Sequence, residues 1–357
     1  MTIHPRRQIL SVVLLLALFS LLVVSCIHSG ALPGEGQKSW KFAIISDTQG
    51  DNKDAVNKTC INDAVLRAIA DDIAQEKPDL VLVAGDLVNG WFRNGGTDYD
   101  TQYANWKKAM RPVYQAGIRV YPIRGNHDSG PERLALPPLP RHLEPPPDTV
   151  QRLKETFRKH FGHNPQNGPG EEAGLTYSLV HKNALFIGLD QFTGGQHQVN
   201  QAWLNGQLGD KGSPHVFIYG HEPAFETRHR DNLGFYPKKR DAFWNAIGKA
   251  GGKAYFCGHD HFYNRALIPD DAGHPIRQII VGTGGGNLKK WSGRYQDKRV
   301  QGEYHNGDHH GYVLVTVAGT KVTVIWKALM QPGAFGAWQH LDVFTYDLPI
   351  FPWKKRG

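Results

Sequence analysis

The chain has 357 residues, with 41 Lys or Arg against 33 Asp or Glu, so its formal net charge is +8. A composition of 40% hydrophobic and 21% charged residues excludes a disordered chain, and three cysteines are too few for a disulfide scaffold. The positive charge is spread along the chain without a basic block, and the sequence has no nucleic-acid-binding motif.

The N-terminal segment predicts export. Arg6 and Arg7 precede an apolar run over residues 9–24, which is the order of a signal peptide, and the run is short for a membrane-spanning helix. The Val-Val-Ser-Cys sequence that ends at Cys26 resembles the lipobox of bacterial lipoproteins. This resemblance implies a signal peptide over residues 1–25, lipidation of Cys26 and a lipidated tether over residues 26–40.

An uncleaved anchor helix is the alternative for this segment. Either form places the folded part outside the cytoplasm, in a bacterial cell envelope, where the protein faces the periplasm or the outside. Cleavage would remove two arginines and no acid, which leaves a net charge of +6.

Beyond the tether, short apolar runs alternate with amphipathic segments. The sequence predicts strands at 42–45, 80–83, 120–123, 176–180, 184–189, 215–219, 254–257, 277–281, 312–317 and 321–327. It predicts helices at 61–73, 99–116, 148–161, 200–208 and 238–249. The early strand–helix alternation indicates parallel strands, and the strand-rich second half indicates a mixed sheet or a pair of sheets.

No linker divides this part of the chain. We expect one domain over residues 41–330, followed by a C-terminal extension over 331–357 that packs on the domain or trails from it. Residues 131–147, with seven prolines, and residues 285–311 are expected to be long loops. Cys257 ends a buried strand, so Cys257 and Cys60 are expected to remain unbridged.

Polar clusters follow five of the predicted strands, where open α/β sheets place their ligand sites. They are Asp47-Thr48-Gln49, Gly85-Asp86, Gly125-Asn126-His127-Asp128, Gly220-His221 and Gly258-His259-Asp260-His261. Carboxylate, amide and imidazole groups are suitable ligands for zinc, manganese or iron ions. His259 and His261 lie two residues apart, so both rings can address one site from an extended segment.

The order of these motifs resembles the calcineurin-like metallophosphoesterase family, from about residue 41 to about residue 327. The resemblance implies an α/β fold, a four-layer α/β/β/α sandwich of two mixed sheets flanked by helices, with two divalent or trivalent metal ions (Mn, Fe or Zn). The first ion would be held by Asp47, Asp86 and His261, and the second by Asp86, Asn126, His221 and His259. His127 would be the general acid, and Asp128 would orient its ring.

Two positions depart from the patterns of known relatives. The first family motif is usually Asp-x-His, and here Gln49 stands in place of the histidine as a weaker metal ligand. The segment 254–261 looks like that of purple acid phosphatases, but Asn89 stands where their iron-binding tyrosine would be. We therefore expect a colourless site with an altered first metal position.

The ligand set implies hydrolysis of phosphate esters of small molecules by a hydroxide that bridges two metal ions, with His127 donating a proton to the leaving group. A phosphodiesterase or pyrophosphatase on the same metal core remains an alternative. A degenerate, non-catalytic ligand-binding member is another, for which only Gln49 argues.

Substrate contacts are less specific in the sequence. Arg93 follows the Asp86 motif, and Arg228 and His229 follow the His221 motif, so these residues either line the rim of the site or are merely solvated. The glycine-rich turn 282–286 is expected to be structural.

Overall fold

The structure, a computed structural model, describes residues 38–50, 59–90, 98–130, 148–193, 195–209, 212–330 and 337–348. The predicted signal peptide, Cys26, nearly all of the tether, Arg93 and the proline-rich loop 131–147 lie outside these residues. No helix within the described ranges is both long and apolar enough to cross a membrane.

The first sheet has six strands in the order β13-β12-β11-β1-β2-β3. The parallel strands are β1 (Trp40–Ile45), β2 (Leu80–Ala84) and β3 (Arg119–Ile123). The antiparallel strands are β11 (His310–Ala318), β12 (Lys321–Leu329) and β13 (Trp338–Asp347). The helices on its outer face are α3 (Asp63–Glu76), α4 (Tyr99–Ala109), α5 (Arg111–Gln115) and α7 (Thr149–His160), and the short α6 (Asn126–Ser129) follows β3.

The second sheet has seven strands in the order β10-β8-β9-β7-β6-β5-β4. Its central parallel strands are β5 (Ala184–Gly188), β6 (His215–Tyr219), β7 (Ala254–Cys257) and β9 (Pro275–Val281). The antiparallel strands are β4 (Tyr177–His181), β8 (Tyr263–Pro269) and β10 (Gln301–Asn306). Helices α8 (Gln201–Gly209) and α9 (Pro237–Lys249) cover its outer face, and two short 3₁₀ turns, Gly170–Glu172 and Leu233–Phe235, complete the elements.

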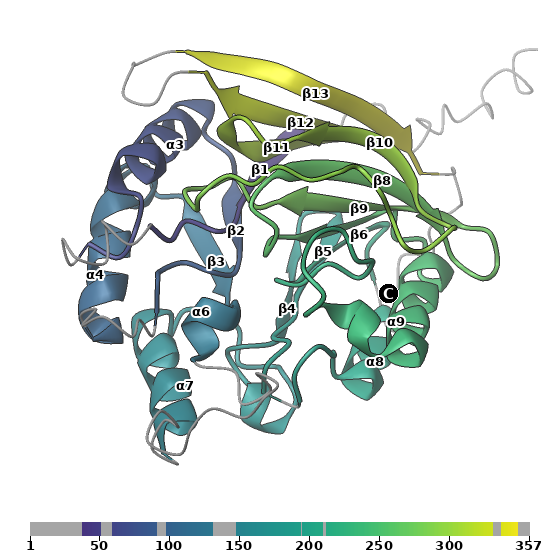
Figure 1. The fold of residues 1–357 in the computed structure, drawn as a ribbon, viewed down its shortest axis with the longest axis horizontal. Coiled ribbons are helices and arrows are strands. Elements are labelled where there is room, and N and C mark those ends of the chain that lie inside the picture. The colour runs from purple at the N-terminus through teal and green to yellow at the C-terminus, as the bar shows by residue number, and fades with distance from the viewer. Residues whose placement is uncertain are drawn as a thin grey trace, which may run out of the picture. The chain divides into compact units, whose positions relative to one another are not determined.

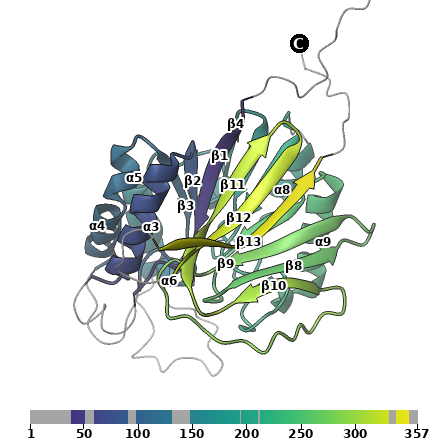
Figure 2. The same ribbon diagram turned by 90° about the horizontal axis from the view of Figure 1, so that it is seen from above.

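The two sheets stack face to face between the two groups of helices, as Figures 1 and 2 show. The alternation of side chains along β1 illustrates why. Phe42 and Ile44 join the core between the sheets, whereas Ala43 and Ile45 join the core beneath the helices. A third core packs α8 and α9 against the second sheet. The predicted four-layer α/β/β/α sandwich is confirmed.

The structure differs from the predicted elements in several places: strands β8, β10 and β13 were not predicted, and one predicted helix is divided. The helix predicted at 99–116 is two helices, because Pro112 lacks the N–H that would continue α4, and α4 ends at Ala109. The predicted loop 285–311 contains β10, an edge strand with mostly exposed side chains. Cys60 and Cys257 are buried, and no disulfide joins them, as predicted.

Candidate metal centre

Five chain segments bring the predicted ligands to one edge of the two sheets, because the carboxyl ends of parallel strands meet there. Asp47 follows β1, Asp86 follows β2 and His259 follows β7, each with a left-handed backbone, at φ of 56°, 50° and 70°. Such values are uncommon for residues other than glycine and concentrate at functional sites. Asn126 begins α6, and His221 follows β6.

One group of ligand atoms gathers beside Asp47. The Nε2 atom of His261 lies 3.6 Å from Asp47 Oδ1. The amide Nε2 of Gln49 lies 3.1 Å from both Asp86 Oδ2 and His261 Nε2, whereas its Oε1 is buried and has no hydrogen-bond partner. The two ends of a side-chain amide can exchange by rotation, so the same position can present oxygen instead of nitrogen.

A second group gathers beside Asn126 and shares Asp86 with the first. Asn126 Oδ1 lies 2.9 Å from His221 Nε2 and 3.2 Å from His259 Nδ1. His221 Nε2 also lies 3.4 Å from Asp86 Oδ2. Potential ligand atoms of Asp47, Asp86 and His221 all lie within 4.8 Å of one another, and the three residues are buried.

The histidine tautomers leave lone pairs directed at these groups. A backbone carbonyl only accepts hydrogen bonds, so Nδ1 of His221 carries a hydrogen that it donates to the carbonyl of Ala84 at 2.9 Å. Nδ1 of His261 likewise donates to the carbonyl of Asn287 at 3.1 Å. In a neutral ring the other nitrogen then faces the carboxylates with a lone pair, which is the arrangement of metal-binding histidines.

The donor set therefore fits metal ions. Two ligand atoms at about 2.1 Å from one ion lie roughly 3.0–3.4 Å apart, depending on the coordination angle. The separations within the second group, from 2.9 to 3.4 Å, match this range. Buried oxygen and nitrogen lone pairs that face one another repel unless a proton or a cation lies between them.

The electrostatics of the site favour positive charge beside Asp86. Burial opposes ionisation of Asp86, but His221 and His127 outweigh it and hold the pKa of this carboxyl well below its usual range. Burial also disfavours the charged form of His221, yet the Asp86 charge raises the pKa of that imidazole to about 10. The centre is built to hold cationic charge.

His127 lies beside these groups without joining either. Its Nδ1 lies 2.8 Å from the carbonyl of Asn89 and therefore carries a hydrogen, and its Nε2 lies 3.9 Å from Asp86 Oδ2. The His127 side chain is 32% exposed, whereas that of His221 is fully buried. The carbonyl of Asn89, at the position of the missing tyrosine, thus holds the ring.

Asp128 was expected to contact the His127 ring, but no hydrogen bond joins these two residues, both of which the structure describes. Asp128 accepts hydrogen bonds from the amides of Gly125 (2.9 Å) and Leu87 (3.1 Å) and from the Tyr103 hydroxyl (3.2 Å). Burial, and then the Asp86 charge, raise the pKa of Asp128 to about 7. Through these hydrogen bonds its carboxyl group connects the backbone of the Asn126 motif to that of the Asp86 motif. Asp128 therefore positions the backbone and does not contact the His127 ring.

Close backbone packing explains the glycines of the motifs. A Cβ on Gly258 would lie 2.0 Å from Ser46 Oγ and 2.1 Å from Asp47 Oδ2. In the glycine-rich turn, the amides of Gly284 and Gly286 donate to the carbonyls of Ser46 (2.9 Å) and Asp47 (2.8 Å). The turn supports the Asp47 segment, in agreement with the structural role expected for it.

Of the predicted substrate contacts, Arg228 and His229 lie beside the centre. The His229 ring packs 4.8 Å from the ring of His259, and Arg228 Nη1 lies 2.6 Å from His229 Nε2. Arg228 is exposed and His229 half-buried, so this loop borders the centre on its solvent side.

Three supporting residues were not predicted. Gln191 Oε1 accepts from the amides of His221 and Glu222, both at 2.7 Å, and Asp231 lies 3.4 Å from His259. His310 donates through Nδ1 to the carbonyl of Thr283 at 3.2 Å, and burial lowers its pKa, with a smaller lowering effect from the nearby His261. Only Gln191 carried a signal in the sequence, because it follows a predicted strand.

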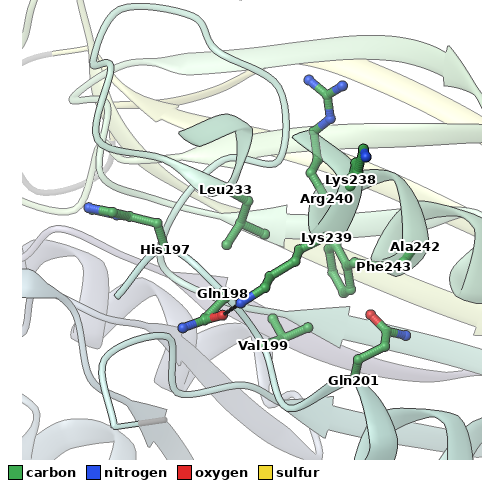
Figure 3. A pocket seen from close by; sticks show the side chains of 10 residues that line it. All are labelled: His197, Gln198, Val199, Gln201, Leu233, Lys238, Lys239, Arg240, Ala242 and Phe243. Carbon is green, nitrogen blue, oxygen red and sulfur yellow. Dashed lines mark hydrogen bonds between the residues drawn. The ribbon is translucent and has the colours of Figure 1, made fainter. Parts of the chain in front are cut away.

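A cavity of about 360 Å³ lies between α8, α9 and the turn at Leu233, away from these ligands (Figure 3). Its walls are largely apolar, and the Lys239 side chain reaches across it to Gln198. None of the predicted site residues lines it. The metal-ligand cluster, and not this cavity, therefore defines the candidate site.

Residues 19–263 match the calcineurin-like phosphoesterase family. The chain therefore belongs to that family, as predicted, and is a phosphoric ester hydrolase of the metallophosphoesterase class. Family membership indicates divalent metal ions as cofactors, and Asp47, Asp86 and His221 form a group able to hold one. No curated protein matches the sequence.

Three solved structures share the fold. PhoD has 14% identity and a TM-score of 0.61, with 88% of this chain and 71% of PhoD covered. The purple acid phosphatase PPD1 of yellow lupin (Lupinus luteus) has 17% identity and a TM-score of 0.61, with 87% of this chain covered, but the match spans only 54% of PPD1. GAP50, the anchor in the inner membrane complex of Plasmodium, has 15% identity and a TM-score of 0.52, with 88% and 90% covered.

Proposed function

We propose that the chain hydrolyses phosphate esters at a centre of two metal ions. Asp47, Gln49, Asp86 and His261 would hold one ion, and Asp86, Asn126, His221 and His259 would hold the other. The observation that carries this proposal is the convergence of two groups of buried or half-buried ligand atoms that share the Asp86 carboxylate.

When bound, such ions supply an acidic water and positive charge for the phosphoryl oxygens. The protein side chains fix where that chemistry occurs. The Asp86 carboxylate is held by the His127 amide at 2.9 Å, and the Asp47 carboxylate by the His259 amide at 3.0 Å. Both carboxylates therefore present fixed oxygens, which reduces reorganisation during the reaction.

His127 is the proposed general acid. Because the carbonyl of Asn89 fixes the hydrogen on Nδ1, the opposite nitrogen is the one that can carry and release a second proton. It is also the most exposed of the four motif histidines, at 32% against 17% for the side chain of His261. A leaving group can therefore reach His127 from solvent.

Arg228 and His229 are the proposed substrate contacts, together with Arg93, which lies outside the described residues. An exposed guanidinium beside the centre can pair with a phosphoryl oxygen of the substrate through two N–H groups. The net positive charge of the chain would favour approach of such an anion.

A panel of aryl phosphate monoesters and diesters, assayed with Mn, Zn and Fe, tests this proposal. We expect metal-dependent release of the aryl alcohol. A preference for diesters would identify a phosphodiesterase on the same core. If no ester and no pyrophosphate is hydrolysed with any of the three metals, the proposal is contradicted. The alternative of a non-catalytic ligand-binding protein would then be favoured.

We also propose that the chain is exported to a bacterial cell envelope and attached to the membrane through a lipid on Cys26. The support is the apolar run after Arg6 and Arg7 and the lipobox-like sequence ending at Cys26. Cys26→Ser should release the protein from the membrane fraction or block its maturation. Unchanged membrane attachment of this variant would contradict lipidation and favour an uncleaved anchor.

A further inference from the structure

The loop from Thr227 to Asn232 is fastened to the segment that carries His259 and His261. Asp260 lies between these two histidines and is fully buried. Its carboxylate accepts hydrogen bonds from the Thr227 hydroxyl and from the amides of Arg228 (3.1 Å) and His229 (3.2 Å). The ligand-bearing segment thus holds the backbone of the loop.

Two pairs of aspartate and histidine connect the loop and this segment in opposite directions. Asp260 of the segment lies 2.6 Å from Nδ1 of His229 in the loop, an ion-pair contact without the alignment of a hydrogen bond. Asp231 of the loop lies 3.4 Å from Nε2 of His259 in the segment, an ion-pair contact without the alignment of a hydrogen bond. The two imidazole rings pack against each other at 4.8 Å. We call these four residues the Asp–His clasp.

The clasp reaches the metal centre through His259. The ring nitrogen that faces Asp231 is Nε2, so a hydrogen there meets a carboxylate, and Nδ1 is left with its lone pair toward Asn126 Oδ1. A cation on Nδ1 polarises the ring and strengthens the attraction between the Nε2 hydrogen and Asp231. The contact between Asp231 and His259 therefore favours both metal binding and an ordered loop.

The other half of the clasp reaches Arg228. The guanidinium donates to His229 Nε2, so the hydrogen of the His229 ring is on Nδ1, facing Asp260. The Asp260 charge thus attracts the side of the His229 ring opposite the nitrogen that accepts from Arg228. The order of this proposed substrate contact depends on a residue between two metal ligands.

We propose that the Asp–His clasp couples metal binding at His259 to the order of the loop Thr227–Asn232, with Asp231 and Asp260 as positioning residues. This inference rests on the proposed metal centre. Because such coupling is reciprocal, loss of Asp231 weakens metal binding, and removal of the metal loosens the loop.

The first test is metal affinity in the absence of substrate, measured by calorimetry with Mn²⁺ and Zn²⁺. Asp231→Ala should weaken binding about 10- to 100-fold, the usual effect of losing the partner of a metal-binding histidine. Asp231→Asn keeps an oxygen that accepts from Nε2 and should recover part of that loss. Asp100→Ala is a matched control, because Asp100 is also half-exposed and paired with a histidine, His160 at 2.8 Å, but outside the centre.

The second test is hydrogen exchange of the Arg228 and His229 amides, which donate hydrogen bonds to the Asp260 carboxylate. Metal should slow their exchange in the wild-type chain and in Asp100→Ala, and much less in Asp231→Ala. The proposed coupling would be contradicted by equal metal affinity in Asp231→Ala and Asp100→Ala, or by loop exchange that is the same with and without metal, even if the enzyme is active. If neither ion binds the wild-type chain, both the proposed coupling and the proposed metal centre are wrong.

Discussion

His127 differs from the other histidines of the motifs. Its Nδ1 donates a hydrogen bond to the Asn89 carbonyl, and its Nε2 faces both solvent and Asp86. His127→Ala should lower kcat by about 10²- to 10⁴-fold, the usual contribution of a general acid, and leave the metal content unchanged. Steady-state kinetics together with metal analysis check this. Loss of metal from the variant would instead make His127 a ligand.

Gln49 makes the first metal position unusual. Its amide can donate to Asp86 and His261 at 3.1 Å, and so satisfies these two groups without a cation. Gln49→His should tighten metal binding at this position, because imidazole is a better ligand and cannot stabilise the empty arrangement through two N–H groups. Metal counts per chain at limiting metal check this, with Gln151→His, at an exposed position of α7, as the control for an added histidine. Unchanged counts in Gln49→His would contradict the assignment of Gln49 to the centre.

At the scale of elements, β13 is fastened to the second sheet by one ion-pair cluster. Asp342 of β13 accepts from Arg265 Nε (2.8 Å) and Nη2 (2.9 Å) and from the Tyr263 hydroxyl (2.8 Å), both on β8. Asp342 and Arg265 are largely buried. This cluster joins the edge strand β13 of the first sheet to β8, an inner strand of the second sheet.

Asp342→Ala should lower the free energy of unfolding by about 3 kcal/mol, because it leaves the buried Arg265 guanidinium without its main partner. Denaturant unfolding measures the change. Lys159→Ala, which breaks an exposed pair with Asp100, should cost less than about 1 kcal/mol. If both variants lost equally little, the β13 contact would have no special role in stability.

The sequence did not reveal β8, β10 and β13, in which polar or charged residues interrupt the apolar ones. β10 has no buried side chain, β13 has one, and in β8 the buried polar residues Asn264 and Arg265 follow Tyr263. Hydrophobic periodicity detects a strand by the apolar side chains that it buries, so a strand with exposed side chains or with buried charged residues gives a weak signal. The strands that are buried at every position, β2, β5, β6 and β7, were all predicted.

The candidate site shows the same division. Its candidate ligands follow predicted strands, and they were predicted from their position and residue type together with the family resemblance. Asn89 acts through its backbone carbonyl, and Asp231 through a contact with His259 across the fold. Such roles depend on tertiary contacts and leave no motif in the sequence.

For the whole molecule, buried His215 makes stability depend on pH. It lies at the start of β6 and donates through Nε2 to the carbonyl of Gly319 at 2.7 Å. Burial lowers its pKa, against the opposing effect of this hydrogen bond. As the pH falls below about 6.5, the unfolded chain takes up a proton that the folded chain resists, so stability falls.

His215→Gln removes this proton uptake. Between pH 7 and pH 5 the wild-type chain should lose more unfolding free energy than the variant, as measured by urea titration at each pH with chelator present throughout. The difference between the two chains isolates His215, because all other histidines are common to both. Parallel pH profiles would show that His215 does not resist protonation in the folded state.

The central claim is that the buried ligand cluster binds metal ions that phosphate-ester hydrolysis requires. The most direct measurement is turnover of an aryl phosphate ester by chelator-treated protein during stepwise return of Mn²⁺ or Zn²⁺, with bound metal counted per chain. We predict no turnover without metal, recovery that follows occupancy up to two ions per chain, and higher thermal stability of the loaded protein. Turnover that survives complete removal of metal, or metal binding that never restores it, would contradict the account.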